Sequence, residues 1–400
     1  MKSATSTGLR NFGAATLALA FLAGCSTHSQ PKPDEAKVRQ FTGQGYLTDD
    51  QFGVATSFAT WTAGERRFDI ALTVPAKPGP FPLVIYLPAL GETRSAGEEW
   101  RTAWAQGGYA VLSVQALAED AKPWPVATGA RAGDFAMLAR ERYAVKVMTA
   151  RLEAVAAVMT ELSRRHSAQE SPLERIDLSK VAVAGFDLGA YTAMAVAGEN
   201  IRGVSPPILP VPITAVIALS PYADFSGAAF DTRYGGVHVP VLSITSDNDA
   251  DMLGVVTSPA VRKAPFQYMP AGGKYLLTMA DIPHSTLGGS DVKPGAGEEA
   301  RVPEQGGPGG ADPRAGGRRG GNRRGSGDRA GPGAWGGEGG SSHFGGARSS
   351  PTAKAIGVAA IQSITAAFLD AYVKKDSIAR EWLDKDVPRW LGDKGEIRKK

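Results

Sequence analysis

The stretch VAVAGFDLGAYTAMAVA, Val181–Ala197, decides the fold that we expect for this 400-residue chain. Its first half is a run of small apolar residues that ends at Phe186, as in a buried strand, and its second half has the composition of a helix. Gly185 and Gly189 flank the junction and permit a tight turn between the two. The pattern is G-x-D-x-G, so Asp187 stands where the pattern G-x-S-x-G has a serine.

Strand and helix patterns alternate on both sides of this stretch. A long helix is predicted from Tyr143 to Arg165, with Val145, Met148 and Leu152 on its apolar face. In RRFDIALTVPA, polar and apolar residues alternate as in an edge strand. Six further segments are continuously apolar, as in buried parallel strands. These runs are PLVIYLPA, YAVLSVQ, KVAVAGF, ITAVIALSP, VPVLSITS and KYLLTMA. The alternation predicts one α/β domain with a mostly parallel, doubly wound sheet.

The first residues have the features of an export signal. Lys2 and Arg10 precede an uncharged run, residues 12–23, that is too short to span a bilayer. The run ends in Leu-Ala-Gly-Cys25, which resembles the lipobox of bacterial lipoproteins, and Cys25 is the only cysteine. We therefore expect lipidation of Cys25 and a lipid-anchored protein of the bacterial cell envelope, on the periplasmic side of a membrane or at the cell surface; an incidental cysteine is the alternative.

Residues 288–350 are rich in glycine and arginine and almost free of aliphatic side chains, so we expect a disordered insertion. The helical pattern that follows, with Ile361, Ile364 and Phe368 on one face, indicates that the same domain continues. The predicted organisation is a signal peptide (1–24), a tether (25–45), an α/β domain (46–287), the insertion (288–350) and a C-terminal helical part of the domain (351–400).

The formal net charge of +4 does not indicate a nucleic-acid partner. Lys2 and Arg10 lie in the predicted signal peptide, and residues 288–350 carry nine basic and seven acidic side chains. The predicted folded part is therefore close to neutral. The Arg-Gly pattern is similar to RNA-binding segments, but a solvated spacer is the favoured interpretation.

Chemically capable residues follow several predicted strands. Asp187 follows VAVAGF, Asp247 and Asp249 follow VPVLSITS, and His284 follows KYLLTMA. Because the carboxyl ends of parallel strands meet at one edge of a sheet, we expect these side chains to converge. Of the two aspartates after VPVLSITS, the spacing from the strand end favours Asp249 over Asp247.

The segments IDLSKVAVAGFDLGAYTAMAVAG, VPVLSITSDND, IPHSTLGG and AAFLDAYVKKDSIAREWL resemble the dienelactone hydrolase and platelet-activating-factor acetylhydrolase branch of the α/β-hydrolases. The resemblance implies an α/β-hydrolase fold without a large cap domain. It places Asp187 at the nucleophile, His284 at the general base and Asp249 at the acid. It also places the backbone amides of Leu188 and Leu90 in the oxyanion hole.

The sequence departs from this family in two ways. Pro88-Ala89 replaces the usual His-Gly before Leu90, and Asp187 replaces serine or cysteine. A carboxylate is ordinarily ionised at neutral pH and needs no base, so His284 would activate water instead. Attack by a carboxylate on an ester carbonyl gives a reactive anhydride, whereas attack on a saturated carbon gives an ester that water can cleave. The alternative is that Asp187 only caps the following helix.

These features predict an exported hydrolase of esters or related small substrates with an Asp-His-Asp site. A catalytically inactive lipoprotein that binds a ligand or serves the envelope is the competing interpretation. No metal-ligand cluster or nucleotide fingerprint occurs in the sequence, so neither a cofactor nor a metal is expected. The expected partners are a small molecule and, through Cys25, a membrane.

Overall fold

The structure, a computed structural model, describes residues 32–48, 51–121, 132–223, 228–250, 255–256, 258–290 and 350–400. The folded unit extends from Pro33 to Lys400. The predictions for the signal peptide, for Cys25 and for nearly all of the insertion concern residues outside these ranges.

Nine strands of the described residues form one sheet in the order β1-β2-β4-β3-β5-β6-β7-β8-β9. Their bounds are β1 Val54–Ala63, β2 Arg66–Pro75, β3 Phe81–Leu87, β4 Ala110–Val114, β5 Ile176–Phe186, β6 Ile213–Leu219, β7 Val241–Asn248, β8 Lys274–Pro283 and β9 Gly395–Lys399. The strands from β4 to β8 pair in parallel, and β1, β2 and β9 are antiparallel to their neighbours. The expectation of an α/β domain with a mostly parallel sheet is confirmed.

The edge strand was predicted wrongly. Residues 66–75 form β2, which pairs with β1 on one side and β4 on the other, so the strand at this edge of the sheet is β1. Most β1 side chains are exposed, which is why its sequence lacks the apolar run of a buried strand.

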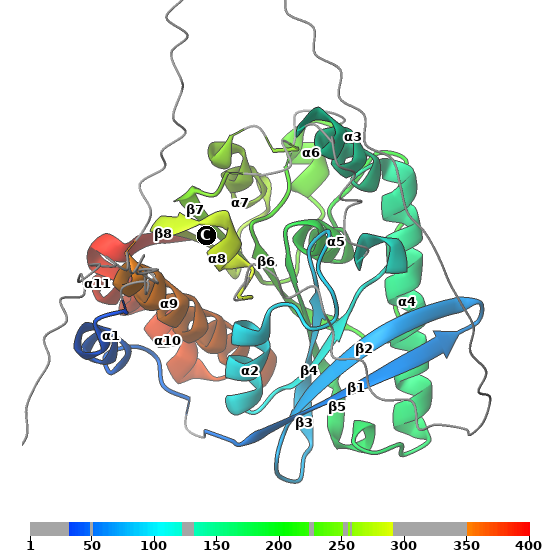
Figure 1. The fold of residues 1–400 in the computed structure, drawn as a ribbon, viewed down its shortest axis with the longest axis horizontal. Coiled ribbons are helices and arrows are strands. Elements are labelled where there is room, and N and C mark those ends of the chain that lie inside the picture. Colours follow the sequence, from blue (N-terminus) through cyan, green and yellow to red (C-terminus); the bar gives the residue numbers. More distant parts are fainter. Residues whose placement is uncertain are drawn as a thin grey trace, which may run out of the picture. The chain divides into compact units, whose positions relative to one another are not determined.

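Helices cover both faces of the sheet (Figure 1). Their bounds are α1 Glu35–Thr42, α2 Glu98–Gln106, α3 Ala132–Arg142, α4 Val145–Ser167, α5 Leu188–Val196, α6 Phe230–Tyr234, α7 Ala264–Tyr268, α8 His284–Leu287, α9 Pro351–Leu369, α10 Ser377–Lys385 and α11 Val387–Leu391. Helices α2, α9, α10 and α11 pack on one face, and α4, α5 and α7 pack on the other. The parallel strands are therefore buried on both sides, as their continuous apolar sequences require.

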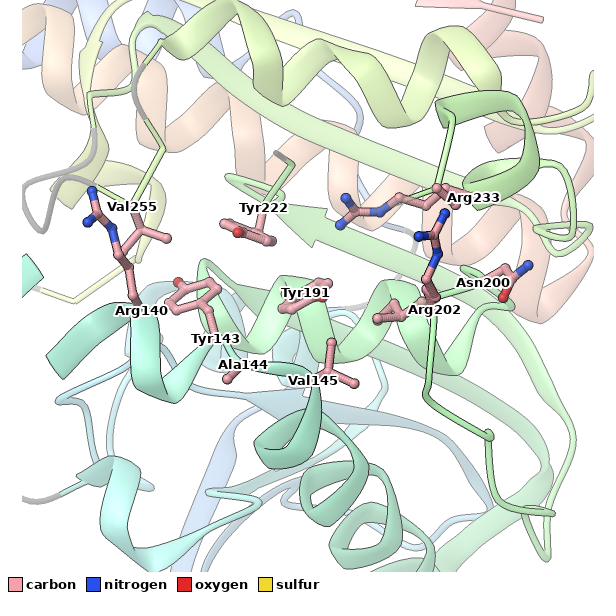
Figure 2. A pocket seen from close by; sticks show the side chains of 12 residues that line it. Arg140, Tyr143, Ala144, Val145, Tyr191, Asn200, Arg202, Tyr222, Arg233 and Val255 are labelled. Carbon is pink, nitrogen blue, oxygen red and sulfur yellow. The ribbon is translucent and has the colours of Figure 1, made fainter. Parts of the chain in front are cut away.

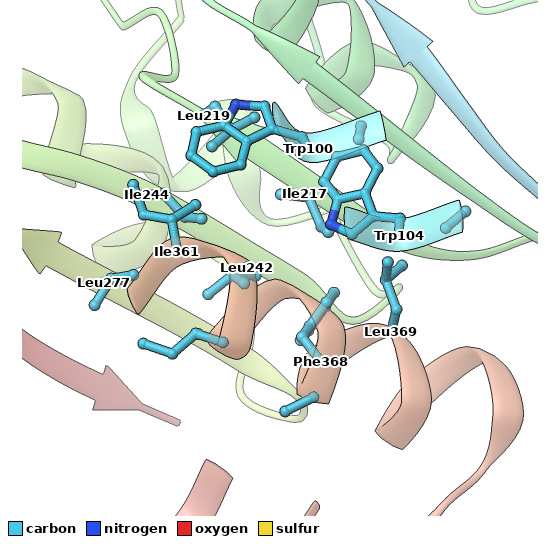
Figure 3. Close-up of a cluster of buried hydrophobic side chains, with 14 of the residues drawn as sticks. Trp100, Trp104, Ile217, Leu219, Leu242, Ile244, Leu277, Ile361, Phe368 and Leu369 are labelled. Carbon is cyan, nitrogen blue, oxygen red and sulfur yellow. The ribbon is translucent and has the colours of Figure 1, made fainter. Parts of the chain in front are cut away.

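The alternation of side chains along a strand divides the core into two layers. In β6, Ile217 and Leu219 face α2 and α9, whereas Val216 and Ala218 face the layer of α4 and α5. Figure 3 shows the first layer, in which Trp100 and Trp104 of α2 meet apolar side chains of α9 and the strands.

The helix predicted after the insertion is α9, and it belongs to the core. Its apolar residues Ile361, Ile364 and Phe368 are fully buried. With the π-helical turn that follows, residues Pro351–Lys374 are long and apolar enough to cross a membrane, but 83% of the most apolar window is buried inside the fold. The apolar character of α9 is thus explained by packing.

Three boundaries differ from the prediction. The expected tether includes α1, which lies in the folded unit, where Phe41 stacks on Trp390 at 4.4 Å between ring centroids. Gly289 also belongs to the fold, because its carbonyl accepts a hydrogen bond from the Glu99 amide. The long helix begins at Val145, whose side chain is exposed and not on the apolar face.

Candidate functional site

The turn between β5 and α5 is as tight as its two glycines suggest. A Cβ on Gly189 would lie 1.9 Å from the carbonyl oxygen of Leu87, and one on Gly185 would lie 2.3 Å from Gly189 itself. Asp187, at the apex, has φ 50° and ψ −106°, a conformation that non-glycine residues rarely adopt. Such strain persists where the surrounding structure enforces it, which is frequent at functional sites.

The Asp187 side chain is directed toward other side chains and not toward the helix. The Tyr143 hydroxyl donates a 2.7 Å hydrogen bond to Oδ2 of Asp187. Nη1 of Arg262 lies 3.6 Å from Oδ1, which is an ion-pair distance but too long for a hydrogen bond. Asp187 stands at the N-cap position of α5, but no α5 amide donates to its carboxylate, which argues against the alternative that this side chain only caps the helix.

His284 pairs with Asp249, as predicted. Nδ1 of His284 lies 2.6 Å from Oδ1 of Asp249, and both residues stand directly after neighbouring strands, β8 and β7. Ser220 and Thr245 donate further hydrogen bonds to Asp249, at 2.6 and 2.7 Å. Asp247 is 67% exposed and pairs with Lys263 instead. The geometry therefore favours Asp249 over Asp247.

This pairing changes the protonation of both members. Burial by itself would lower the pKa of His284, but the hydrogen bond to Asp249 and the charge of Asp187 outweigh it and raise that pKa above 6.5. Burial would raise the pKa of Asp249, but the hydrogen bond from His284 and the charge of Arg262 outweigh it and lower that pKa. Between the described side chains of His284 and Asp187 there is no direct hydrogen bond. Since Nδ1 faces Asp249, Nε2 is the nitrogen available for proton transfer.

Arg262 is the cation of this site. Its side chain is fully buried, 3.6 Å from Asp187 and 3.4 Å from Asp249, and Nη1 donates to the carbonyl of Ser220 at 2.8 Å. A guanidinium keeps its charge in proteins, so Arg262 offsets the charge of two buried carboxylates. Ser220 itself has φ 54°, a second strained residue beside the site.

The expected oxyanion amides lie on two adjacent segments. Leu188 is the first residue of α5, so its amide has no carbonyl within the helix to bond to. Leu90 lies in the loop after β3. The same loop contains Glu92, whose Oε2 accepts a hydrogen bond from the Ala89 amide at 2.9 Å. Burial raises the pKa of Glu92 to about 7. The charge of Asp187 also raises this pKa, whereas the hydrogen bond from the Ala89 amide lowers it.

A buried ion pair joins the Leu90 loop to Tyr143. Arg151 binds both carboxylate oxygens of Asp120 at 2.9 Å, and the two side chains are almost inaccessible. The Asp120 carbonyl accepts from the Gly91 amide at 2.6 Å, and Arg151 donates to the Arg142 carbonyl, the residue before Tyr143. This pair connects the loop after β3 with the segment that supplies Tyr143.

A pocket of about 390 Å³ is lined by Tyr143, the residue that donates a hydrogen bond to Asp187 (Figure 2). Tyr143, Tyr191 and Tyr222 form its centre, with ring centroids 4.6–6.0 Å apart. Three arginines line its two ends, Arg140 at one and Arg202 and Arg233 at the other. The volume lies within the usual range of small-molecule sites. Tyr143 lines the pocket and donates a hydrogen bond to Asp187, so this side chain links the pocket to the tight turn.

The predicted residues Asp187, Asp249, His284, Leu188 and Leu90 thus all lie at the carboxyl edge of the sheet. Sequence reasoning missed Tyr143, Arg262, Ser220 and Glu92. Ser220 and Glu92 follow β6 and β3, so the strand-end rule could have found them; Tyr143 and Arg262 come from connecting segments without a pattern.

The described residues contain no group of three potential metal ligands. No protein-family model matches the chain, and no curated protein matches it significantly.

Proposed function

We propose that the chain is an exported lipoprotein of the α/β-hydrolase superfamily, in the dienelactone-hydrolase-like branch, that hydrolyses a small substrate through Asp187, His284 and Asp249. The strand order β1-β2-β4-β3-β5-β6-β7-β8 and the strained turn before α5 support this fold assignment. Among the described residues, the connection from β6 to β7 contains only α6, which agrees with a fold without a large cap.

The observation that carries the proposal is the combination of the strained Asp187 with the Asp249–His284 pair. A carboxylate that only stabilised the fold would need neither this backbone conformation nor a histidine of raised pKa beside it. An oxygen of Asp187 attacks a saturated carbon. A halide leaves with the bonding electron pair, whereas the oxygen of an opened epoxide stays on the substrate, keeps that pair and takes a proton from water. Nε2 of His284 then takes a proton from water, which cleaves the resulting ester.

This chemistry favours alkyl halides or epoxides over carboxyl esters. Attack of Asp187 on an ester carbonyl would give an anhydride, so we expect weak turnover of carboxyl esters.

A screen with 1-bromohexane, styrene oxide and 4-nitrophenyl acetate tests the proposal, using wild type, Asp187→Ala and the control Asp247→Asn. Turnover of a halide or epoxide should fall by on the order of 10³-fold or more in Asp187→Ala and stay unchanged in Asp247→Asn. Turnover that survives Asp187→Ala would contradict the proposal.

A non-catalytic binding protein is the second candidate. It is favoured by one observation: Tyr143 and Arg262 both contact the Asp187 carboxylate and reduce its nucleophilicity. This candidate predicts that ligands bind the pocket without turnover and that binding survives His284→Gln.

The proposed location rests on Leu-Ala-Gly-Cys25. Mass spectrometry of the mature amino terminus should find an acylated Cys25, and a different, unmodified start would contradict the lipid anchor.

A further inference from the structure

The two oxygens of Asp187 have different environments. Oδ2 accepts a 2.7 Å hydrogen bond from Tyr143, whereas the nearest cation to Oδ1, Nη1 of Arg262, is 3.6 Å away. A hydrogen-bonded oxygen is the poorer nucleophile because its lone pair is already engaged. Oδ1 is therefore the oxygen that attacks, and Oδ2 becomes the carbonyl oxygen of the covalent ester.

We infer that Tyr143 is a catalytic residue for the second half of the reaction, in which its hydroxyl stabilises the oxyanion that forms on Oδ2 of Asp187. The inference rests on the proposed function, since it requires the covalent ester. Tyr143 would thus stabilise the oxyanion on Asp187, as the amides of Leu188 and Leu90 would stabilise an oxyanion on a substrate carbonyl.

For an alkyl substrate, hydrolysis of the Asp187 ester proceeds by addition of water and then elimination of the alkoxide. Water attacks the carboxyl carbon of Asp187, a new C–O bond forms, and one proton of the water passes to Nε2 of His284. The electron pair of the C=O bond moves to Oδ2, where the Tyr143 O–H donates to it. The pair then returns, the bond from the carboxyl carbon to the alkoxy oxygen breaks, and the leaving alkoxide takes the proton from His284.

The surroundings of Tyr143 suit this role. The residue lies between α3 and α4, is 6% exposed, and packs against Tyr191 and Tyr222. Arg151, which donates to the carbonyl of the preceding residue, fixes the backbone at this point. A donor fixed in advance and shielded from water stabilises a developing charge best, because it need not reorganise during the reaction.

Tyr143→Phe should separate the two half-reactions. Loss of one oxyanion donor slows ester hydrolysis by about 10²–10³-fold. Alkylation of Asp187 should be unchanged or faster, since its carboxylate loses a hydrogen bond. A merely structural role for Tyr143 would slow both half-reactions together.

The experiment mixes each variant with styrene oxide or 1-bromohexane, quenches at intervals and weighs the peptide that contains Asp187. His284→Gln should accumulate the ester because hydrolysis stops, and Tyr143→Phe should accumulate it because hydrolysis is slow. Wild type and the control Tyr268→Phe, which changes an exposed tyrosine of α7, should not. A 3-fluorotyrosine at position 143 retains the donor and should hydrolyse the ester within a few-fold of the wild-type rate, which controls for altered packing.

Two results would overturn the inference and differ in meaning. If His284→Gln accumulates the ester but Tyr143→Phe hydrolyses it at the wild-type rate, Tyr143 is not the donor and the proposed function stands. If no variant forms an ester with either probe, Asp187 is not a nucleophile toward these substrates, and the proposed function falls together with the inference.

Discussion

At the scale of single residues, charges of both signs meet at one edge of the sheet. The carboxylates of Asp187 and Asp249 share the buried cation Arg262, and His284 has a raised pKa beside them. Glu92 adds a further carboxyl group whose pKa of about 7 lies near neutrality. Glu92 therefore changes charge close to physiological pH.

The Glu92 carboxyl makes stability depend on pH in a predictable direction. Its pKa is 4.5 in the unfolded chain and about 7 in the fold, so between these values the folded state holds a proton that the unfolded state has lost. The free energy of unfolding therefore contains a favourable contribution below pH 4.5 that is lost as pH rises to 7.

Glu92→Gln, which stays neutral, should match wild type near pH 5 and exceed it in stability by about 1–3 kcal/mol at pH 8. Urea unfolding across this pH range measures the difference, with Glu119→Gln, an exposed glutamate, as the control. A constant difference between Glu92→Gln and wild type would refute the raised pKa.

The sequence predicted the residues that follow strands but not those from connecting segments. Asp187, Asp249 and His284 could be found because each directly follows an apolar run, and such ends converge in a parallel sheet. Tyr143 and Arg262 are 44 and 75 residues from Asp187 in the chain. Their contacts depend on how the connecting segments fold, for which no local pattern exists.

At the scale of elements, the close crossing of β5, α5 and β3 positions the site. The carbonyl of Leu87 at the end of β3 occupies the space that a side chain on Gly189 would need. The same crossing brings the loop of Leu90 next to the first amide of α5. The close packing of the backbone thus determines the geometry of the site. The two glycines of the G-x-D-x-G pattern predicted this tight turn.

Gly189→Ala should destabilise the protein by about 3 kcal/mol or more, because the new Cβ would overlap the Leu87 carbonyl at 1.9 Å. Gly53→Ala is the matched control, since its Cβ would be 3.8 Å from that of Ala76 and should cost about 1 kcal/mol or less. Equilibrium urea unfolding compares them. Equal stabilities for the two variants would mean that the crossing is not as tight as described.

The long helices and buried strands could be predicted because their apolar residues repeat with a helical period or form uninterrupted runs. The edge strand β1 could not, because its mostly exposed side chains are under no such constraint. Helix α1 was likewise assigned to the tether. None of its residues is buried, so its sequence carries no apolar pattern that would predict packing.

At the scale of the whole molecule, both sides of the glycine-rich sequence belong to one folded unit. Before it, Gly289 accepts a hydrogen bond from the Glu99 amide of α2. After it, Gln362 of α9 donates to the same glutamate. Both flanks are therefore hydrogen-bonded to the same helix.

Replacing residues 291–349 by a short Gly-Ser linker should leave the fold intact and change the melting temperature by only a few degrees, because loop length affects stability weakly. Circular dichroism during heating measures the change. A loss of many degrees would indicate that the replaced residues pack against the domain.

A single turnover in ¹⁸O water tests whether Asp187 forms a covalent ester that water cleaves. Enzyme in excess is mixed with the halide or epoxide that it turns over, and the peptide containing Asp187 and the product are weighed. A covalent ester leaves one ¹⁸O atom in the Asp187 carboxylate and an unlabelled new hydroxyl in the product, because the hydroxyl oxygen comes from Asp187. Label in the product with none in Asp187 would contradict it, since water would then have attacked the substrate directly.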